Sequence, residues 1–170
     1  MAGGIGVAPK IGYLLPTRES VMQGKPAAGP LLKLAERAEE LGYDSIWIGD
    51  SLLDRPRHEP LVMLAGVAGR MKRVLLGTGV LLPALRNPVQ LAHQVATLDQ
   101  VSEGRIILGI GISPDQPGIH AEFDAVGVPF ENVSDGCAKA ALPRALDWRA
   151  GDVGRPVAAG ERGDRSGPAP

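Results

Sequence analysis

Four continuously apolar segments recur about 30 residues apart, and they constrain the fold of this chain more than any other feature. They cover residues 11–15, 45–49, 73–81 and 105–110. None of them alternates apolar with polar residues, as a strand with one face in solvent would. Apolar runs of this kind, separated by helical segments, predict parallel strands that are covered on both faces. We therefore expect an α/β protein.

Proline and glycine mark the helices between these strands. The first helix is predicted from Pro30 to Gly42, and its apolar residues share one face: Leu31, Leu34, Ala35, Ala38 and Leu41. Further helices are predicted over residues 59–68 and 87–101, and Asn87 is the expected N-cap of the last one. Residues 17–29 contain Gly, Pro and Ser and predict a loop.

The composition excludes several classes of protein. With 18 Lys and Arg against 19 Asp and Glu, the chain lacks the positive charge of a nucleic-acid or anionic-membrane binder. No apolar run approaches the roughly 18 residues of a membrane-spanning helix. The single cysteine, Cys137, excludes an internal disulfide, and no secretion signal precedes the first strand. These features predict a cytoplasmic protein that binds neither nucleic acid nor membrane.

The composition changes near residue 134. In residues 134–170, Ala, Gly, Pro and Arg fill 23 of 37 positions, and Ile, Phe, Tyr and Met are absent. A segment this poor in large apolar residues predicts a disordered, low-complexity tail. Out-of-frame translation of GC-rich DNA yields the same four residue types and is a second interpretation of its origin. We therefore divide the chain into an ordered domain, residues 1–133, and a tail, residues 134–170.

The spacing of strands and helices leaves two architectures open. A closed (β/α)8 barrel requires about 250 residues, so the four units here would form its first half. The roughly 130 ordered residues would nearly suffice for a small, open, doubly wound sheet instead. Motifs have to distinguish the two.

Five motifs, in order along residues 11–131, provide that distinction. They are residues 39–50 (EELGYDSIWIGD), 76–80 (LGTGV), 86–88 (RNP), 98–105 (LDQVSEGR) and 108–111 (LGIG). In this order and spacing they resemble the N-terminal half of the bacterial luciferase-like monooxygenases, a family of flavin- or deazaflavin-dependent enzymes. The resemblance implies a (β/α)8 TIM barrel of which this chain holds about the first four units.

The resemblance implies an oxidoreductase that acts on a small molecule. The cofactor would be reduced FMN, which reacts with molecular oxygen in a monooxygenase, or the deazaflavin coenzyme F-420, which serves reductases and dehydrogenases. A third interpretation is a truncated, non-catalytic remnant, because the family usually carries its cofactor phosphate site in the second half of the barrel. A half barrel also exposes sheet edges, which predicts self-association, for example as a homodimer.

Candidate catalytic residues follow from the rule that barrel active sites gather at the carboxyl ends of the strands. Asp50 ends the second strand, and His58 lies on the same rim. The family commonly has a histidine directly after this acidic residue, whereas this chain has Ser51, a poor proton donor at neutral pH. His93 and His120 are expected to pack or to face solvent. The three histidines share no metal-ligand spacing, so no metal is predicted.

Glycines at the strand ends predict a surface that a flat cofactor ring can approach closely. The resemblance implies ring contacts with Thr78, Gly79, Val80, Gly111 and Ser113. It also implies that a non-prolyl cis peptide sometimes occurs at the Gly-Val step. A dinucleotide phosphate loop at residues 109–111 is disfavoured, because prolines follow where the fingerprint needs a third glycine and a helix.

Overall fold

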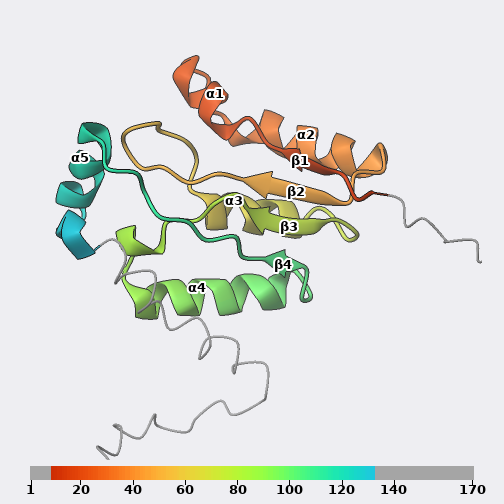
Figure 1. Ribbon diagram of the computed structural model, residues 1–170. Helices are drawn as coiled ribbons and strands as arrows, with labels where there is room; N and C mark the ends of the chain where they lie inside the picture. Colours follow the sequence, from red (N-terminus) through yellow and green to blue (C-terminus); the bar gives the residue numbers. More distant parts are fainter. Residues whose placement is uncertain (1–8, 133–170) are drawn as a thin grey trace, which may run out of the picture.

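The computed structural model describes residues 9–132, which form a parallel sheet with helices packed against it (Figure 1). The strands are β1 (Gly12–Leu14), β2 (Ser45–Ile48), β3 (Leu75–Thr78) and β4 (Ile106–Ile107). The helices are α1 (Thr17–Met22), α2 (Ala28–Glu40), α3 (Pro60–Ala68), α4 (Pro88–Val101) and α5 (Pro117–Ala125), with 3-10 turns η1 (Pro83–Leu85) and η2 (Phe130–Asn132). The predicted tail, residues 134–170, and Cys137 lie outside the described residues.

The four strands are parallel and lie side by side in sequence order, β1-β2-β3-β4. Across the sheet, Tyr13 pairs with Ile46, Ile46 with Leu76 and Leu76 with Ile106. Consecutive β/α units of a barrel have this order, whereas a doubly wound sheet reverses its order at one point. The predicted α/β class and the parallel pairing are therefore confirmed.

Side-chain caps set the starts of α3 and α4, and the Asn87 cap is the one that the sequence predicts. The Asn87 side chain accepts hydrogen bonds from the N–H groups of Val89, at 3.0 Å, and Gln90, at 3.2 Å, and so caps α4. The Glu59 carboxylate does the same for α3, accepting from Val62 N–H at 2.7 Å. Both helices have proline in the first turn, where no N–H is needed. Local sequence therefore determines where the two helices begin.

The helices cover one face of the sheet. Ile46, Ile48 and Leu76 point to that face and are fully buried in the core cluster that also contains Leu64 of α3. Leu14 points to the opposite face and is 58% exposed. The expectation that both faces are covered is therefore wrong for residues 9–132. In a complete barrel this second face looks into the interior, where other strands oppose it.

The Trp47 indole lies across this open face of the sheet. Its Nε1 donates a hydrogen bond to Ser45 Oγ at 2.8 Å. A Cβ atom on Gly77 would lie 2.3 Å from a carbon of the indole, and one on Gly12 would lie 2.4 Å from its Nε1. Glycine in β1 and in β3 therefore makes room for Trp47, which spans three neighbouring strands.

Two helices lie outside the predicted ones, and the first of them replaces part of an expected loop. Residues 17–22 form α1, whose first residue, Thr17, is buried and whose Ser20 hydroxyl donates to the Thr17 carbonyl. Residues 117–125 form α5, which packs beyond the carboxyl ends of β2 and β3 (Figure 1). Glu122 interrupts the apolar pattern of α5, so the helix has no simple hydrophobic periodicity in the sequence.

The predicted apolar face of α2 is partly wrong. Leu34 and Leu41 are 41% and 61% exposed, while Leu31, Ala35 and Ala38 are buried. The buried residues follow the spacing i, i+4 and i+7, so the contact stripe is narrower than the run of apolar residues. Leu41 lies at the C-cap, past the last turn that contacts the sheet.

The Arg105 side chain fastens the start of β4 to the neighbouring units. Its guanidinium donates to the carbonyl oxygens of Val74 and Met71, each at 2.9 Å, and more weakly to that of Ala68 at 3.4 Å. Its Nε donates to the Ser102 carbonyl at 2.7 Å. One cation thereby satisfies carbonyls at the end of α3, at the start of β3 and at the end of α4.

Arg105→Met should destabilise the domain, because it removes every one of these donors while keeping the apolar stem. We expect the free energy of unfolding to fall by about 1.5–3 kcal/mol, the range for hydrogen bonds from a charged group. Arg70→Met is the matched control, since Arg70 makes an exposed ion pair with Glu36 at 2.9 Å, and such pairs contribute about 0–1 kcal/mol. Urea denaturation measures both variants, and equal losses would contradict the assigned role of Arg105.

Candidate functional site at the carboxyl ends of the strands

The fold brings the ends of β2, β3 and β4 together. Gly79 N–H donates to the Ile48 carbonyl at 2.8 Å, which joins the end of β3 to the end of β2. On the other side, Leu81 N–H donates to the Gly109 carbonyl at 2.7 Å, and Gly111 N–H donates to the Leu81 carbonyl at 2.9 Å. The predicted positions Asp50, Gly79, Val80 and Gly111 therefore belong to one continuous edge.

The peptide bond between Gly79 and Val80 is cis, as the sequence resemblance implied. Around Gly79 there is open space: a Cβ atom there would meet only the Trp47 ring, at an ordinary 3.6 Å. The Val80 side chain is 44% exposed and lies against Gly111, where a Cβ atom would come within 2.4 Å of it. Gly111 therefore accommodates Val80, and Gly79 is the position that leaves the backbone open to a ligand.

Thr78 and Ser113, the other two predicted ring contacts, are both buried. Thr78 Oγ1 donates to the Gly109 carbonyl at 2.8 Å, so its hydroxyl joins β3 to the end of β4 and only its backbone is left for a ligand. Ser113 Oγ has no hydrogen-bond partner among the described residues. Because this oxygen is itself buried, a ligand reaches it only after the surrounding segment moves.

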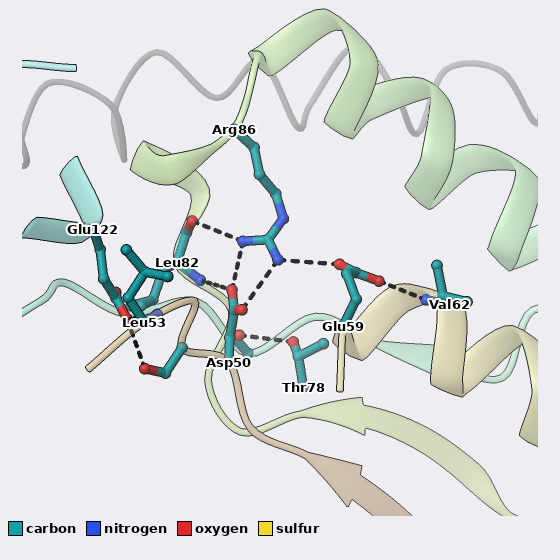
Figure 2. A network of polar contacts seen from close by, with 10 residues as sticks. Asp50, Leu53, Glu59, Val62, Thr78, Leu82, Arg86 and Glu122 are labelled. Atoms are coloured by element: carbon teal, nitrogen blue, oxygen red, sulfur yellow. Dashed lines mark hydrogen bonds and ion pairs between the residues drawn. The ribbon is translucent and has the colours of Figure 1, made fainter. Parts of the chain in front are cut away.

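Asp50 forms a buried ion pair with Arg86 (Figure 2). Only 5% of the Asp50 side chain and 18% of the Arg86 side chain are exposed. The two guanidinium nitrogens bind separate carboxylate oxygens, and Leu82 N–H donates to Asp50 Oδ2 at 2.9 Å. Both oxygens of the predicted catalytic carboxylate are thus occupied, and Asp50 connects the end of β2 to the segment that follows β3.

Arg86 has a second acidic partner on the neighbouring helix. One guanidinium nitrogen lies 3.1 Å from Glu59 Oε1, while the other Glu59 oxygen caps α3 (Figure 2). Burial acts to lower the pKa of Arg86, but the hydrogen bonds and charges of Asp50 and Glu59 outweigh it and raise that pKa above its ordinary value. Arg86 therefore stays charged and holds the starts of α3 and α4 beside the strand ends.

A second buried carboxylate, Glu122 of α5, holds the loop that follows Asp50. Its Oε1 accepts from Ser51 Oγ at 2.8 Å and from the N–H groups of Leu53, at 2.7 Å, and Asp54, at 2.8 Å. Glu122 is fully buried, and its Oε2 has no partner among residues 9–132. Ser51, which stands where the family commonly has histidine, is thus part of this loop anchor.

The pKa of Glu122 reflects two opposing effects. Burial acts to raise it, but the donors on Asp54, Ser51, Leu53 and Leu52 favour the ionised form and bring the net pKa below 4.5, its ordinary value. Glu122 is therefore an ionised carboxylate at neutral pH, stabilised by neutral donors instead of by a cation.

The three histidines lie apart and have separate contacts. His58 Nε2 is 2.8 Å from the Pro26 carbonyl, so Nε2 carries the proton and Nδ1, which is buried, has no partner in the described part of the chain. His120 stacks on Phe130 and bonds Asp115 Oδ1 at 2.7 Å. His93 lies on α4 and lines a groove of about 610 Å³ between α3 and α4, on the helix side of the sheet.

Residues 9–132 contain neither a cluster of metal-binding side chains nor a membrane-spanning helix. No group of three or more His, Cys, Asp or Glu side chains in this part of the chain could hold a metal ion. None of its helices is both long enough and apolar enough to span a bilayer.

Comparison with known proteins identifies the family. Residues 9–134 match the family model described as luciferase-like monooxygenase. The match covers well over half of the chain and includes every element that surrounds the Gly79–Val80 bond. The chain belongs to the luciferase-like monooxygenase family.

Individual members of the family show what this chain is similar to. It is 42% identical, over 109 residues, to F420-dependent glucose-6-phosphate dehydrogenase from Amycolatopsis mediterranei (strain U-32), with 60% of this chain and 31% of the relative aligned. It is 39% identical, over 105 residues, to 5,10-methylenetetrahydromethanopterin reductase from Methanolobus tindarius, with 60% and 30% aligned. The chain thus spans about a third of the length of these relatives.

The solved structures agree with this assignment. Monooxygenase RslO1 from Streptomyces bottropensis superposes with a TM-score of 0.67 at 29% identity, covering 81% of this chain and 42% of that one. The four parallel units described here are therefore part of the TIM-barrel fold of luciferase-like enzymes, as the motifs predicted.

Arg86 and Glu122 are the site residues that sequence reasoning did not single out. Arg86 was visible as part of the RNP motif, where its role was not assigned. Glu122 shares the buried face of α5 with Ile119 and Phe123, at the spacing of one helical turn. A single acidic residue on an otherwise apolar face indicates that its carboxylate has buried hydrogen-bond partners.

Glu122→Gln should destabilise this luciferase-like domain at pH 7 and have little effect in acid. The pKa of Glu122 is lowered on folding, so its stabilisation is complete above about pH 4.5 and is lost as pH falls through the lower folded value. Urea titrations at pH 7 and at about pH 3 measure the two losses in unfolding free energy. Asp124→Asn, on the exposed face of the same helix, is the control. A loss of equal size at both pH values would contradict the assigned charge of Glu122.

Proposed function

We propose that this chain forms the ring-binding wall of an oxidoreductase that uses a flavin or a deazaflavin to act on a small molecule. The observation that carries this proposal is the open backbone at Gly79–Val80, which lies at the carboxyl ends of the strands beside the buried Asp50–Arg86 pair. Ligands of barrel enzymes bind at this end. The relatives that are at least 39% identical are oxidoreductases by name, which supports the same assignment.

The residues present fit a flat, polar ring. Gly79 and Val80 offer an open backbone and a half-exposed apolar side chain, and Ser113 offers a buried hydroxyl without a partner among the described residues. Thr78 would contribute only backbone atoms, because its hydroxyl is bonded to Gly109. Gly111 supports the ring surface indirectly by making room for Val80. When bound, such a ring supplies hydride transfer or, as a reduced flavin, reaction with oxygen.

Asp50 and His58 take different roles in this proposal. Asp50 positions the segment after β3 by accepting from Arg86 and Leu82, so it shapes the ring site. His58 carries its proton on Nε2, toward Pro26, which leaves Nδ1 as the atom that accepts a proton from a substrate. A rearrangement of the loop around His58 must expose Nδ1 first, because that atom is buried.

Two cofactors are compatible with this wall, and different relatives support each. The likeness to F420-dependent glucose-6-phosphate dehydrogenase supports a deazaflavin reductase or dehydrogenase. The likeness to monooxygenase RslO1 supports a monooxygenase, for which we expect reduced FMN as cofactor and molecular oxygen as co-substrate. Titration of the chain with both cofactors separates the two functions, and binding of neither would favour a non-catalytic remnant.

Gly79→Ala should weaken ring binding without unfolding the domain. The new methyl group enters the open space in front of the backbone, where it meets only Trp47 at an ordinary contact distance of 3.6 Å. We expect at least a tenfold loss of affinity, roughly 1.4 kcal/mol, in fluorescence titrations with FMN and with the deazaflavin. Gly29→Ala on α2, where a Cβ atom meets nothing within 4 Å, is the control. Unchanged affinity in Gly79→Ala would place the ring elsewhere.

We further propose that the open sheet face associates with a second copy of the chain. This face exposes Leu14, and Ile110 and Ile112 beyond β4 are 43% and 59% exposed, while β1 and β4 are the edges of the described sheet. Unpaired edges and uncovered apolar residues favour pairing with another chain. Sedimentation velocity should show a dimer that Leu14→Lys shifts toward monomer, with the exposed Leu41→Lys on α2 as control. A monomer at every concentration would contradict this association.

A further inference from the structure

The Arg57 guanidinium lies directly beside the proposed ring surface. A Cβ atom on Gly49 would come within 2.1 Å of Arg57 Nη1 and 3.3 Å of its Cζ, so the guanidinium occupies the place of a side chain at the end of β2. The same Cβ atom would lie 3.4 Å from the Gly79 carbonyl. Ile48 points to the helices, so this position faces the opposite, open side of the sheet, which also carries Trp47.

The charge of Arg57 is not neutralised by any residue the structure describes. Arg57 forms no ion pair in residues 9–132, and its Nε makes one long hydrogen bond, 3.4 Å, to the Arg55 carbonyl. Asp50, the carboxylate at the end of β2, has both oxygens occupied by Arg86 and Leu82. A half-buried guanidinium without an acidic partner is unusual, because buried charges are normally paired.

The charged groups around Arg57 do not compensate its positive charge. Burial and then the charge of Arg18 lower the pKa of Arg57, and Arg55 acts in the same direction. Glu19 and Asp50 raise it, but their effect is smaller, and the net pKa lies below its ordinary value. The acidic groups around Arg57 thus offset its surroundings only in part.

We propose that Arg57 is an anion-binding subsite for a phosphate or carboxylate group of the ligand that occupies the Gly79–Val80 surface. A guanidinium binds such groups through two parallel hydrogen bonds and stays charged even when burial lowers its pKa. The anionic group belongs either to the substrate or to the side chain of the cofactor. The location of this subsite rests on the proposed function. A simple anion can bind there without the ring, so the two proposals are tested separately.

Arg55 provides a matched comparison within the same loop. It lies two residues before Arg57, its side chain is 58% exposed, and it is 3.5 Å from the Asp54 carboxylate. Removing either arginine changes the net charge of the chain equally. If anions are attracted only by the net charge, both substitutions therefore weaken anion binding equally. If Arg57 forms a specific subsite, only its substitution weakens anion binding.

The first experiment is calorimetric titration of the full chain with inorganic pyrophosphate. Arg57→Gln should weaken binding at least tenfold, Arg57→Lys should restore part of it, and Arg55→Gln should change it less than threefold, since one charge-assisted contact accounts for about a factor of ten or more. Thermal melts verify that each variant is folded. No binding by the unsubstituted chain, or equal losses in Arg57→Gln and Arg55→Gln, would overturn the proposal.

The second experiment identifies the source of the anion by comparing FMN with riboflavin, which lacks the phosphate. If Arg57 holds the cofactor phosphate, Arg57→Gln weakens FMN binding and leaves riboflavin binding unchanged. If Arg57 holds a substrate anion, both flavins bind Arg57→Gln as they bind the unsubstituted chain. Pyrophosphate then still binds the unsubstituted chain when either flavin is present. Should neither flavin bind while pyrophosphate binding depends on Arg57, the proposed function fails and the anion subsite stands.

Discussion

The buried pair of Asp50 and Arg86 is the interaction on which the site depends. It joins the end of β2 to the segment after β3, and through Glu59 it also reaches the start of α3. Removing Arg86 would leave the Asp50 carboxylate uncompensated in a position that is nearly closed to water, which costs more than the pair itself contributes. The geometry of the Gly79–Val80 surface therefore depends on an ion pair that the protein forms without a ligand.

The three charged groups at this edge are stabilised in three different ways. Asp50 is neutralised by a cation, Glu122 is ionised among neutral N–H and hydroxyl donors, and Arg57 has no acidic partner in the described residues. Asp50 accepts on both carboxylate oxygens and Glu122 on Oε1 alone, and both side chains hold loops in place. The uncompensated charge lies on the arginine, so the electrostatic character of the open end is positive although the whole chain is near neutral.

Packing divides the glycines of this region into two kinds. Gly77 and Gly111 have no side chain because Trp47 and Val80 occupy that space. Gly49 gives its space to the Arg57 guanidinium, whereas Gly79 leaves the backbone open. Identical residues at strand ends thus serve the interior packing in some positions and ligand access in another. The sequence pattern that predicted a ring surface is the same for all of them, and only the neighbours distinguish the roles.

Local sequence determined the strands, the caps and the family, while long-range contacts decided the site. Apolar runs, Asn87 and the prolines act on neighbouring residues, so the four strands and the helices between them could be predicted, while the barrel and its strand order were implied by the family resemblance. The partners of Asp50 and Ser51 lie 36 and 71 residues away, and α5 owes its place to those contacts. Which side chain a carboxylate meets depends on strand order and register in three dimensions, and local spacing carries no information about either.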